Sequence, residues 1–119
     1  MEGAIYTFGN VSKMPTDIDK HLVEGEEAKY CYKSVRDMIV FTDKRIIISN
    51  TKGTTGKTGE LITIPYSSIC YYSTENAGTF IDAYCILRLW TKCTKFEINL
   101  SPQEKIGNIA KLLDAYLIK

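Results

Sequence analysis

The sequence has little of several features that mark common classes of functional site. Its 119 residues include one histidine, one tryptophan and three prolines, and its four cysteines form no Cys-x-x-Cys pair. Zinc requires a clustered set of Cys, His or carboxylate ligands. We therefore expect neither a metal site nor a cofactor-binding residue in this chain.

Long hydrophobic runs and an excess of one charge are also missing. The longest apolar run is five residues, and Met1-Glu2-Gly3 is not a basic region followed by an apolar stretch. We expect no transmembrane helix and no signal peptide. With 15 basic and 14 acidic residues the net charge is +1, which gives no general attraction for nucleic acid or anionic lipid. The sequence predicts no nucleic-acid partner and, at most, peripheral membrane contact.

Catalytic groupings are scarce as well. The histidine, His21, lies at the end of a short amphipathic helix predicted over Pro15–Leu22, where it is typical of a surface residue. A Ser or Cys nucleophile needs a histidine beside it. The adjacent carboxylates Glu26 and Glu27 would point to opposite faces of an extended chain. We expect no catalytic residue and a protein that is not an enzyme.

The cysteines Cys31, Cys70, Cys85 and Cys93 fall in or at the ends of predicted strands. Reduced cysteines behave as small hydrophobic residues and persist where disulfides are reduced. We interpret all four as buried free thiols in a cytoplasmic protein.

The centre of the pattern is a predicted β-hairpin. Met38–Phe41 and Ile46–Ile48 are β-branched, apolar runs joined by the polar turn Thr42-Asp43-Lys44. Because apolar residues stand at consecutive positions, side chains on both faces of the hairpin should leave water. This is the nucleus of a β-barrel or sandwich.

Further strands surround this hairpin. The expected strands, in chain order, are Ala28–Lys33, Met38–Phe41, Ile46–Ile48, Leu61–Tyr66, Ser67–Thr74, Thr79–Thr91 and Lys95–Leu100. We place turns at Gly25 and at Glu75–Gly78, and we leave residues 1–14 irregular because their apolar residues are scattered. The whole chain, 1–119, reads as a single domain with its core in residues 22–118.

A C-terminal amphipathic helix is expected over Pro102–Lys119. Ser101, Pro102 and Glu104 form a capping box. The apolar positions that follow at helical spacing are Ile106, Ile109, Ala110, Leu113 and Leu117. The fold class is therefore mainly β, with one helix after seven strands.

Five sequence blocks, in a fixed order, carry a resemblance to a known family. They are Val23–Glu26, Tyr32–Asp37, Val40–Arg45, Ile64–Ile69 and Ala77–Phe80. Together they resemble the bacterial pleckstrin-homology (PH) domain family of small stand-alone proteins, over residues 22–116. The resemblance implies a seven-stranded antiparallel barrel closed by the C-terminal helix. It also implies a prokaryotic origin, no catalytic activity, and assembly as a ring of identical subunits, with five as the expected number.

Two kinds of function are open to such a domain. The first is an assembly module, because Tyr84, Ile86 and Trp90 would share the outer face of the Thr79–Thr91 strand and offer apolar surface to another copy. A chain that covered this face with its own N-terminal residues Ile5, Tyr6 and Phe8 would not need the second copy.

The second is the binding of an anionic lipid or phosphoinositide headgroup. Its candidate residues are Lys33 and Arg36, at the loop between the first two long strands, which could equally be ordinary solvated charges. The glycine-rich stretch Lys52–Gly59 is a further candidate for contact with an unidentified protein partner.

Overall fold

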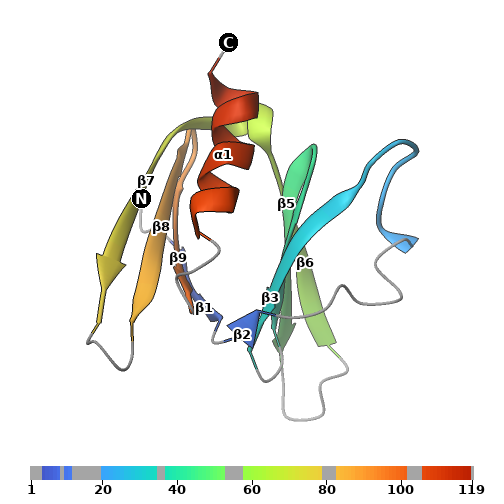
Figure 1. Ribbon diagram of the computed structural model, residues 1–119. Coiled ribbons are helices and arrows are strands. Elements are labelled where there is room, and N and C mark those ends of the chain that lie inside the picture. The colour runs from blue at the N-terminus through green and yellow to red at the C-terminus, as the bar shows by residue number, and fades with distance from the viewer. Residues whose placement is uncertain are drawn as a thin grey trace.

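The protein, described here by a computed structural model, consists of two β-sheets and a C-terminal helix (Figure 1). The structure describes residues 4–8, 10–11, 20–34, 37–52, 58–78, 83–101 and 106–118. One sheet has the order β1 (Ala4–Phe8), β9 (Lys95–Leu100), β8 (Tyr84–Thr91) and β7 (Ile69–Ala77). The other has the order β2 (Asn10–Val11), β3 (Ala28–Lys33), β4 (Met38–Thr42), β5 (Arg45–Lys52) and β6 (Thr58–Pro65). The 3-10 turn η2 (Tyr66–Ser68) and helix α1 (Ile106–Leu117) complete the described elements.

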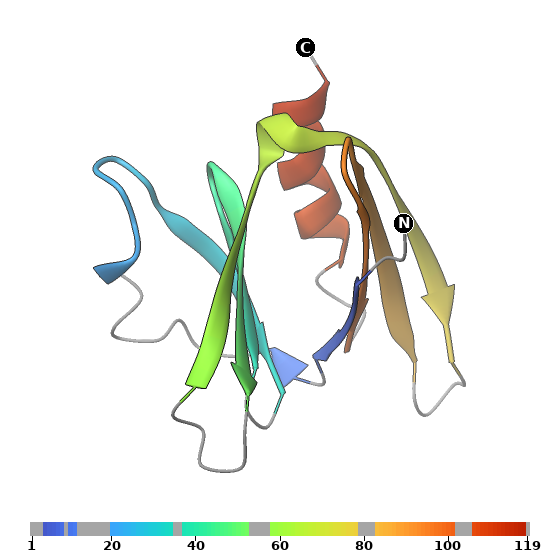
Figure 2. The same cartoon turned by 180° about the vertical axis from the view of Figure 1, so that it is seen from behind.

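The seven expected strands are all present, as β3 to β9, and the PH-like fold is confirmed. The closed barrel is not. The four-stranded and five-stranded sheets remain separate, and β6 and β7 are edge strands that diverge from η2 (Figure 2). The two sheets meet at η2, where Pro65 ends β6 and the chain turns a corner into β7. The opening between them is covered in part by α1 (Figure 1).

The N-terminal segment differs from expectation. Residues 1–14 were predicted to be irregular, but β1 pairs in parallel with β9 and β2 pairs with β3. Phe8 is completely buried, and its carbonyl accepts a hydrogen bond from the Ser101 amide at 3.0 Å. The partner strand β9 lies far away in the sequence, which is why local periodicity gave no signal. Residues 12–19, which hold most of the predicted Pro15–Leu22 helix, lie outside the described residues.

The central hairpin of β4 and β5 is buried on both faces, as predicted. Its inward side chains Ile39, Phe41, Ile46 and Ile48 join the main core between the sheets. On the opposite face Val40 and Ile47 pack with Cys31 in a second cluster, which Leu22 helps to cover. The consecutive apolar residues therefore do fill two different packing environments.

The four cysteines divide into two kinds. Cys31 and Cys85 are buried, as expected, and burial raises the pKa of Cys85. Cys70 and Cys93 are exposed, so the prediction that all four are buried is wrong for these two. Cys70 lies at the irregular start of the edge strand β7, and Cys93 lies in the turn between β8 and β9.

Helix α1 is held against β7 and η2 by aromatic residues. Ile109 and Leu113 are fully buried, and the Tyr72 hydroxyl hydrogen-bonds to the Ala110 carbonyl at 3.2 Å and to the Asp114 carboxylate. The rings of Tyr66 and Tyr116 stack with centroids 5.2 Å apart. The amphipathic helix is confirmed, whereas most of its predicted capping box, residues 102–105, lies outside the described residues.

One predicted turn is misplaced. Glu75–Ala77 belong to β7, which continues to pair with β8 as far as Ala77 opposite Tyr84. The chain reverses later, at Gly78, whose φ of 86° is accessible to glycine at little cost. Strand β7 therefore continues to Ala77, past its predicted end at Thr74, whereas β8 begins at Tyr84 and not at the predicted Thr79; residues 79–82 are not among those described.

Candidate interaction surface

The outward-facing side of the four-stranded sheet carries the residues that were predicted to form a subunit interface. Along β8 the side chains alternate: Cys85, Leu87 and Leu89 are buried in the interior. The intervening residues, Tyr84, Ile86, Arg88 and Trp90, are half-buried on the opposite side. We call this side the outer face. With it we include the cross-strand neighbours Tyr71 and Glu75 on β7 and Lys95, Glu97 and Asn99 on β9.

An aromatic pair occupies one end of the outer face. Tyr71 lies opposite Trp90, and their rings stack with centroids 4.6 Å apart and an interplanar angle of 13°. The ammonium group of Lys95 lies 5.9 Å from the Trp90 ring. Tyr71 remains 59% exposed on the edge strand β7. Trp90 is thus only partly shielded by its own chain.

A charged row crosses the middle of the outer face. Arg88 donates to Glu75 on β7 at 2.7 Å and to Glu97 on β9 at 3.0 Å, so one guanidinium links three strands. The hydrogen bonds to Glu75 and Glu97 raise the pKa of Arg88. Next to this row, the Asn99 amide of β9 donates to the Thr7 hydroxyl of β1 at 3.3 Å.

The three residues Tyr84, Ile86 and Trp90 therefore share one face, as the strand period indicated. They do not form one continuous apolar patch, because Arg88 separates Trp90 from Ile86. Sequence reasoning missed Tyr71, which is the most exposed aromatic side chain of this face. Tyr71 stood in a predicted strand, but its place beside Trp90 depends on a register that the sequence pattern does not contain.

Two of the three N-terminal residues named for covering this face lie elsewhere, and the side chain of the third, Ile5, is outside the described residues. Phe8 is buried in the main core, and Tyr6 packs against the same core. Burial, followed by the nearby charges of Glu60 and Asp37, raises the pKa of Tyr6. Of the three residues named for the covering segment, these two point inward.

The candidate lipid-contact residues are only partly placed. Lys33 is exposed at the end of β3, and Arg36 lies outside the described residues. The loop is short: the Ser34 amide donates to the Asp37 carbonyl at 2.9 Å, and the Asp37 amide donates to the Ser34 hydroxyl at 3.1 Å. The backbone of Asp37 is therefore held next to Ser34, one residue after Lys33. The glycine-rich candidate Lys52–Gly59 is described only at its ends, where Lys52 pairs with Thr58 and Thr51 with Gly59.

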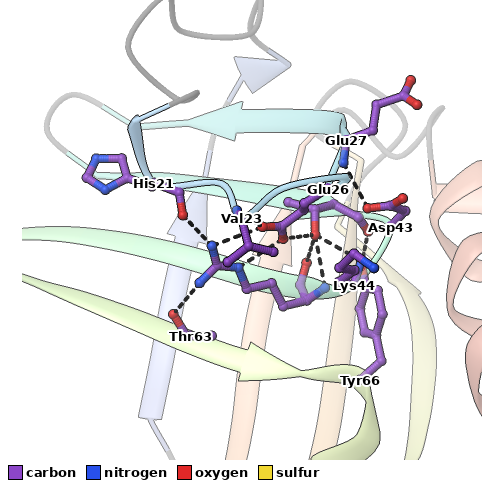
Figure 3. A network of polar contacts seen from close by, with 10 residues as sticks. His21, Val23, Glu26, Glu27, Asp43, Lys44, Thr63 and Tyr66 are labelled. Atoms are coloured by element: carbon purple, nitrogen blue, oxygen red, sulfur yellow. Dashed lines mark hydrogen bonds and ion pairs between the residues drawn. The ribbon is translucent and has the colours of Figure 1, made fainter.

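A second polar cluster lies where the chain enters β3 (Figure 3). The Glu26 carboxylate is fully buried and accepts hydrogen bonds from the Arg45 guanidinium, the Thr42 hydroxyl at 2.6 Å and the Val23 amide at 3.0 Å. Burial alone would raise the pKa of Glu26, but the hydrogen bonds from Arg45, Thr42 and Val23 outweigh it and lower that pKa.

The same cluster closes the turn between β4 and β5. The Thr42 hydroxyl accepts from the amides of Lys44 and Arg45, and the Thr42 carbonyl accepts from the Tyr66 hydroxyl at 2.7 Å. Asp43 and Glu27 exchange two further bonds at 2.9 Å. The carboxylates of Glu26 and Asp43 and the Arg45 guanidinium thus have partners within the fold, and we interpret the cluster as structural (Figure 3). The predicted surface position of His21 is confirmed, and its carbonyl accepts from Arg45.

Within ranges 20–34, 37–52 and the other described segments, no three His, Cys, Asp or Glu side chains are grouped so as to hold a metal ion. No helix in this part of the chain has the length and hydrophobicity needed to span a bilayer.

Comparison with known proteins identifies the family. The model of the bacterial PH domain family matches residues 2–117. The chain belongs to the bacterial PH domain family. It is 38% identical over 115 residues to the uncharacterized protein YjqA of Bacillus subtilis strain 168, covering 90% of this chain and 91% of YjqA. The blocks quoted above, including Val23–Glu26 and Val40–Arg45, are accordingly those of a bacterial PH domain.

Solved structures of bacterial PH domain proteins share the fold of this chain. A DUF1696 family protein with a PH domain from Shewanella loihica PV-4 superposes with a TM-score of 0.77 at 28% identity, covering 92% of this chain and 99% of that one. A PH domain from Shewanella amazonensis SB2B gives a TM-score of 0.61 at 33% identity, covering 87% and 94% of the two chains.

Proposed function

We propose that this bacterial PH domain is a non-enzymatic interaction module that associates with copies of itself through the outer face. The observation that supports the proposal is the Tyr71–Trp90 stack, in which Tyr71 stays 59% exposed on an edge strand. Aromatic side chains that keep a large exposed area are enriched at interfaces, where they contribute much of the binding energy. Burying their remaining apolar area contributes about 25 cal/mol per Å².

The charged row of Arg88, Glu75 and Glu97 is suited to fixing the orientation in which two copies dock. These ion pairs are partly exposed, so they contribute little stability to one chain. At the edge of a contact they would favour one docking orientation over another. The free edge of β7 beside Tyr71 offers backbone hydrogen-bonding groups to the same neighbour. A closed ring of identical subunits, with five as the number implied by the family resemblance, uses one such contact repeatedly.

Sedimentation velocity of the full chain tests the proposal with two matched variants. Tyr71→Lys places a charge on the outer face, and Leu61→Lys makes the same change at a 49% exposed position on β6, in the other sheet. We expect the wild type and Leu61→Lys to sediment as an assembly and Tyr71→Lys to sediment as the 13.5 kDa chain. An assembly that survives Tyr71→Lys, or that is lost equally with Leu61→Lys, would refute the proposed interface.

Binding of an anionic headgroup has less support. Of its two candidate cations, only Lys33 lies among the described residues, where it is an exposed side chain at the end of β3. Cosedimentation with phosphatidylserine vesicles at physiological ionic strength separates the two functions. We expect the wild type to stay in the supernatant. Cosedimentation that is lost on Lys33→Ala with Arg36→Ala would favour the lipid function instead.

A further inference from the structure

A pocket lies between β3 and helix α1, away from the outer face. Its volume is about 300 Å³, and it is lined by Lys29, Tyr30, Asn108, Lys111 and Leu112. Two of these residues come from β3 and three from α1, so the pocket exists only when the helix is docked on the sheets (Figure 1).

The lining divides into a polar and an apolar half. Lys29 and Lys111 bring ammonium groups from two different elements, and Asn108 adds an amide that can donate hydrogen bonds. Tyr30 and Leu112 are partly buried and pack against the main core. Their apolar surfaces are therefore held in place, while the lysines approach from the solvent side.

Among the described residues, the charged groups that line the pocket or pair with its lining are Lys29, Lys111 and Glu27, an excess of one positive charge. Lys29 forms an ion pair with Glu27 at 3.2 Å, but the Glu27 side chain is 71% exposed. An exposed pair of this kind is weak and is readily exchanged for another anion. Lys111 is exposed one helical turn after Gly107, on the solvent side of α1.

We propose that this pocket binds a small organic anion, an oxyanionic group attached to a short apolar chain. Lys29 and Lys111 hold the oxyanion, the Asn108 amide donates to it, and the apolar chain lies against Leu112 and the Tyr30 ring. Charge-assisted hydrogen bonds of this type are the strong ones, and apolar walls with a few polar groups are typical of ligand pockets. A carboxylate and a phosphate monoester both satisfy this chemistry.

Isothermal titration calorimetry on the full chain tests the site with three probes: hexanoate, hexyl phosphate and inorganic phosphate. We expect hexanoate or hexyl phosphate to bind at one site per chain, and the tighter of the two identifies the oxyanion. Inorganic phosphate, which lacks the apolar chain, should bind about tenfold more weakly.

Matched variants locate the site. Lys111→Met removes a charge-assisted contact, and Asn108→Asp adds a charge that repels the oxyanion. Each should weaken binding about tenfold. Lys92→Met and Asn76→Asp make the same exchanges at exposed positions in the β8–β9 turn and on β7, and should leave affinity within about twofold.

Three results would overturn the proposal. The first is the absence of saturable heat with both hexanoate and hexyl phosphate. The second is an affinity for inorganic phosphate equal to that for the alkyl probes. The third is an equal loss of affinity in the pocket variants and the control variants. All four positions are exposed, so the variants should fold, and their melting temperatures verify this. The pocket is lined by β3 and α1, whereas Tyr71 lies on β7, so Tyr71→Lys should bind the probes as the wild type does.

Discussion

The Arg45 guanidinium contacts both oxygens of the Glu26 carboxylate, with Nε 2.9 Å from Oε2 and Nη2 3.0 Å from Oε1. This two-point contact joins the turn before β3 to the first residue of β5. The Glu26 carboxylate is completely buried and the Arg45 side chain is 18% exposed. A buried ion pair of this kind is stable only while both partners are present.

Removing the carboxylate should therefore destabilise the protein strongly. Glu26→Ala leaves Arg45 and the Thr42 hydroxyl without their shared partner. The free energy of unfolding should fall by about 3 to 5 kcal/mol, measured by urea denaturation. Glu24→Ala, two residues away and exposed, should change it by less than about 0.5 kcal/mol. Similar losses for the two variants would show that the buried pair is not what matters.

The same carboxylate should make stability depend on pH in the acid range. The pKa of Glu26 is lowered in the folded protein, below its ordinary value of 4.5. Its contribution is therefore fully present above pH 4.5 and is lost as the pH falls through the folded pKa. Thermal melts on both sides of this value should show a smaller acid loss in Glu26→Ala than in the wild type. An equal loss in both proteins would assign the acid sensitivity to other carboxylates.

Two glycines should respond to alanine with opposite signs. Gly25 has a φ of 82° in the turn that positions Glu26, closed by the Glu26 amide on the Val23 carbonyl at 3.0 Å. Gly25→Ala should cost about 1 kcal/mol because of its left-handed backbone. Gly107 lies in α1 with open space around its Cβ position, so Gly107→Ala should stabilise by about 1 kcal/mol. Chemical denaturation checks both, and shifts of the same sign would contradict the backbone assignment.

The Tyr72 hydroxyl should contribute to docking of the helix. Tyr72→Phe removes its bonds to Ala110 and Asp114, and should lower the free energy of unfolding by about 1 to 2 kcal/mol. Tyr71→Phe, which keeps the exposed ring stack, should have little effect. Burial, followed by the hydrogen bond to Asp114, raises the pKa of Tyr72 to about 12. The Tyr72 contribution should thus be full below pH 10 and be lost as the pH rises through 12. A melting temperature unchanged by Tyr72→Phe would show that the hydroxyl is not needed.

Local patterns predicted the strands and the helix well where each residue's partner lies nearby in the sequence. The alternation of Cys85, Leu87 and Leu89 placed the inner face of β8, and the consecutive apolar residues of β4 and β5 indicated two buried faces. Strand β1 was missed because its partner, β9, is about 90 residues away in the sequence. Its two aromatic residues are also too few to show the alternation that predicts a strand.

The sequence pattern did not predict the features that depend on strand register. Tyr84, Ile86 and Trp90 were correctly placed on one face, but Arg88 interrupts them. It bonds to Glu97 directly opposite on β9 and to Glu75, which lies diagonally across on β7. The burial of Glu26 was not predicted, since nothing local reveals that Arg45 lies close enough to compensate a buried charge. The prediction of a closed barrel was wrong for a similar reason. Closure depends on how far β6 and β7 diverge, and the local sequence pattern does not determine that.

The most direct measurement of the proposed function is the mass of the wild-type protein by sedimentation equilibrium at micromolar concentration. Self-association through the outer face predicts a mass that is a whole multiple of 13.5 kDa, and a closed ring predicts that this mass stays constant as concentration rises. A mass of 13.5 kDa at every concentration would contradict it.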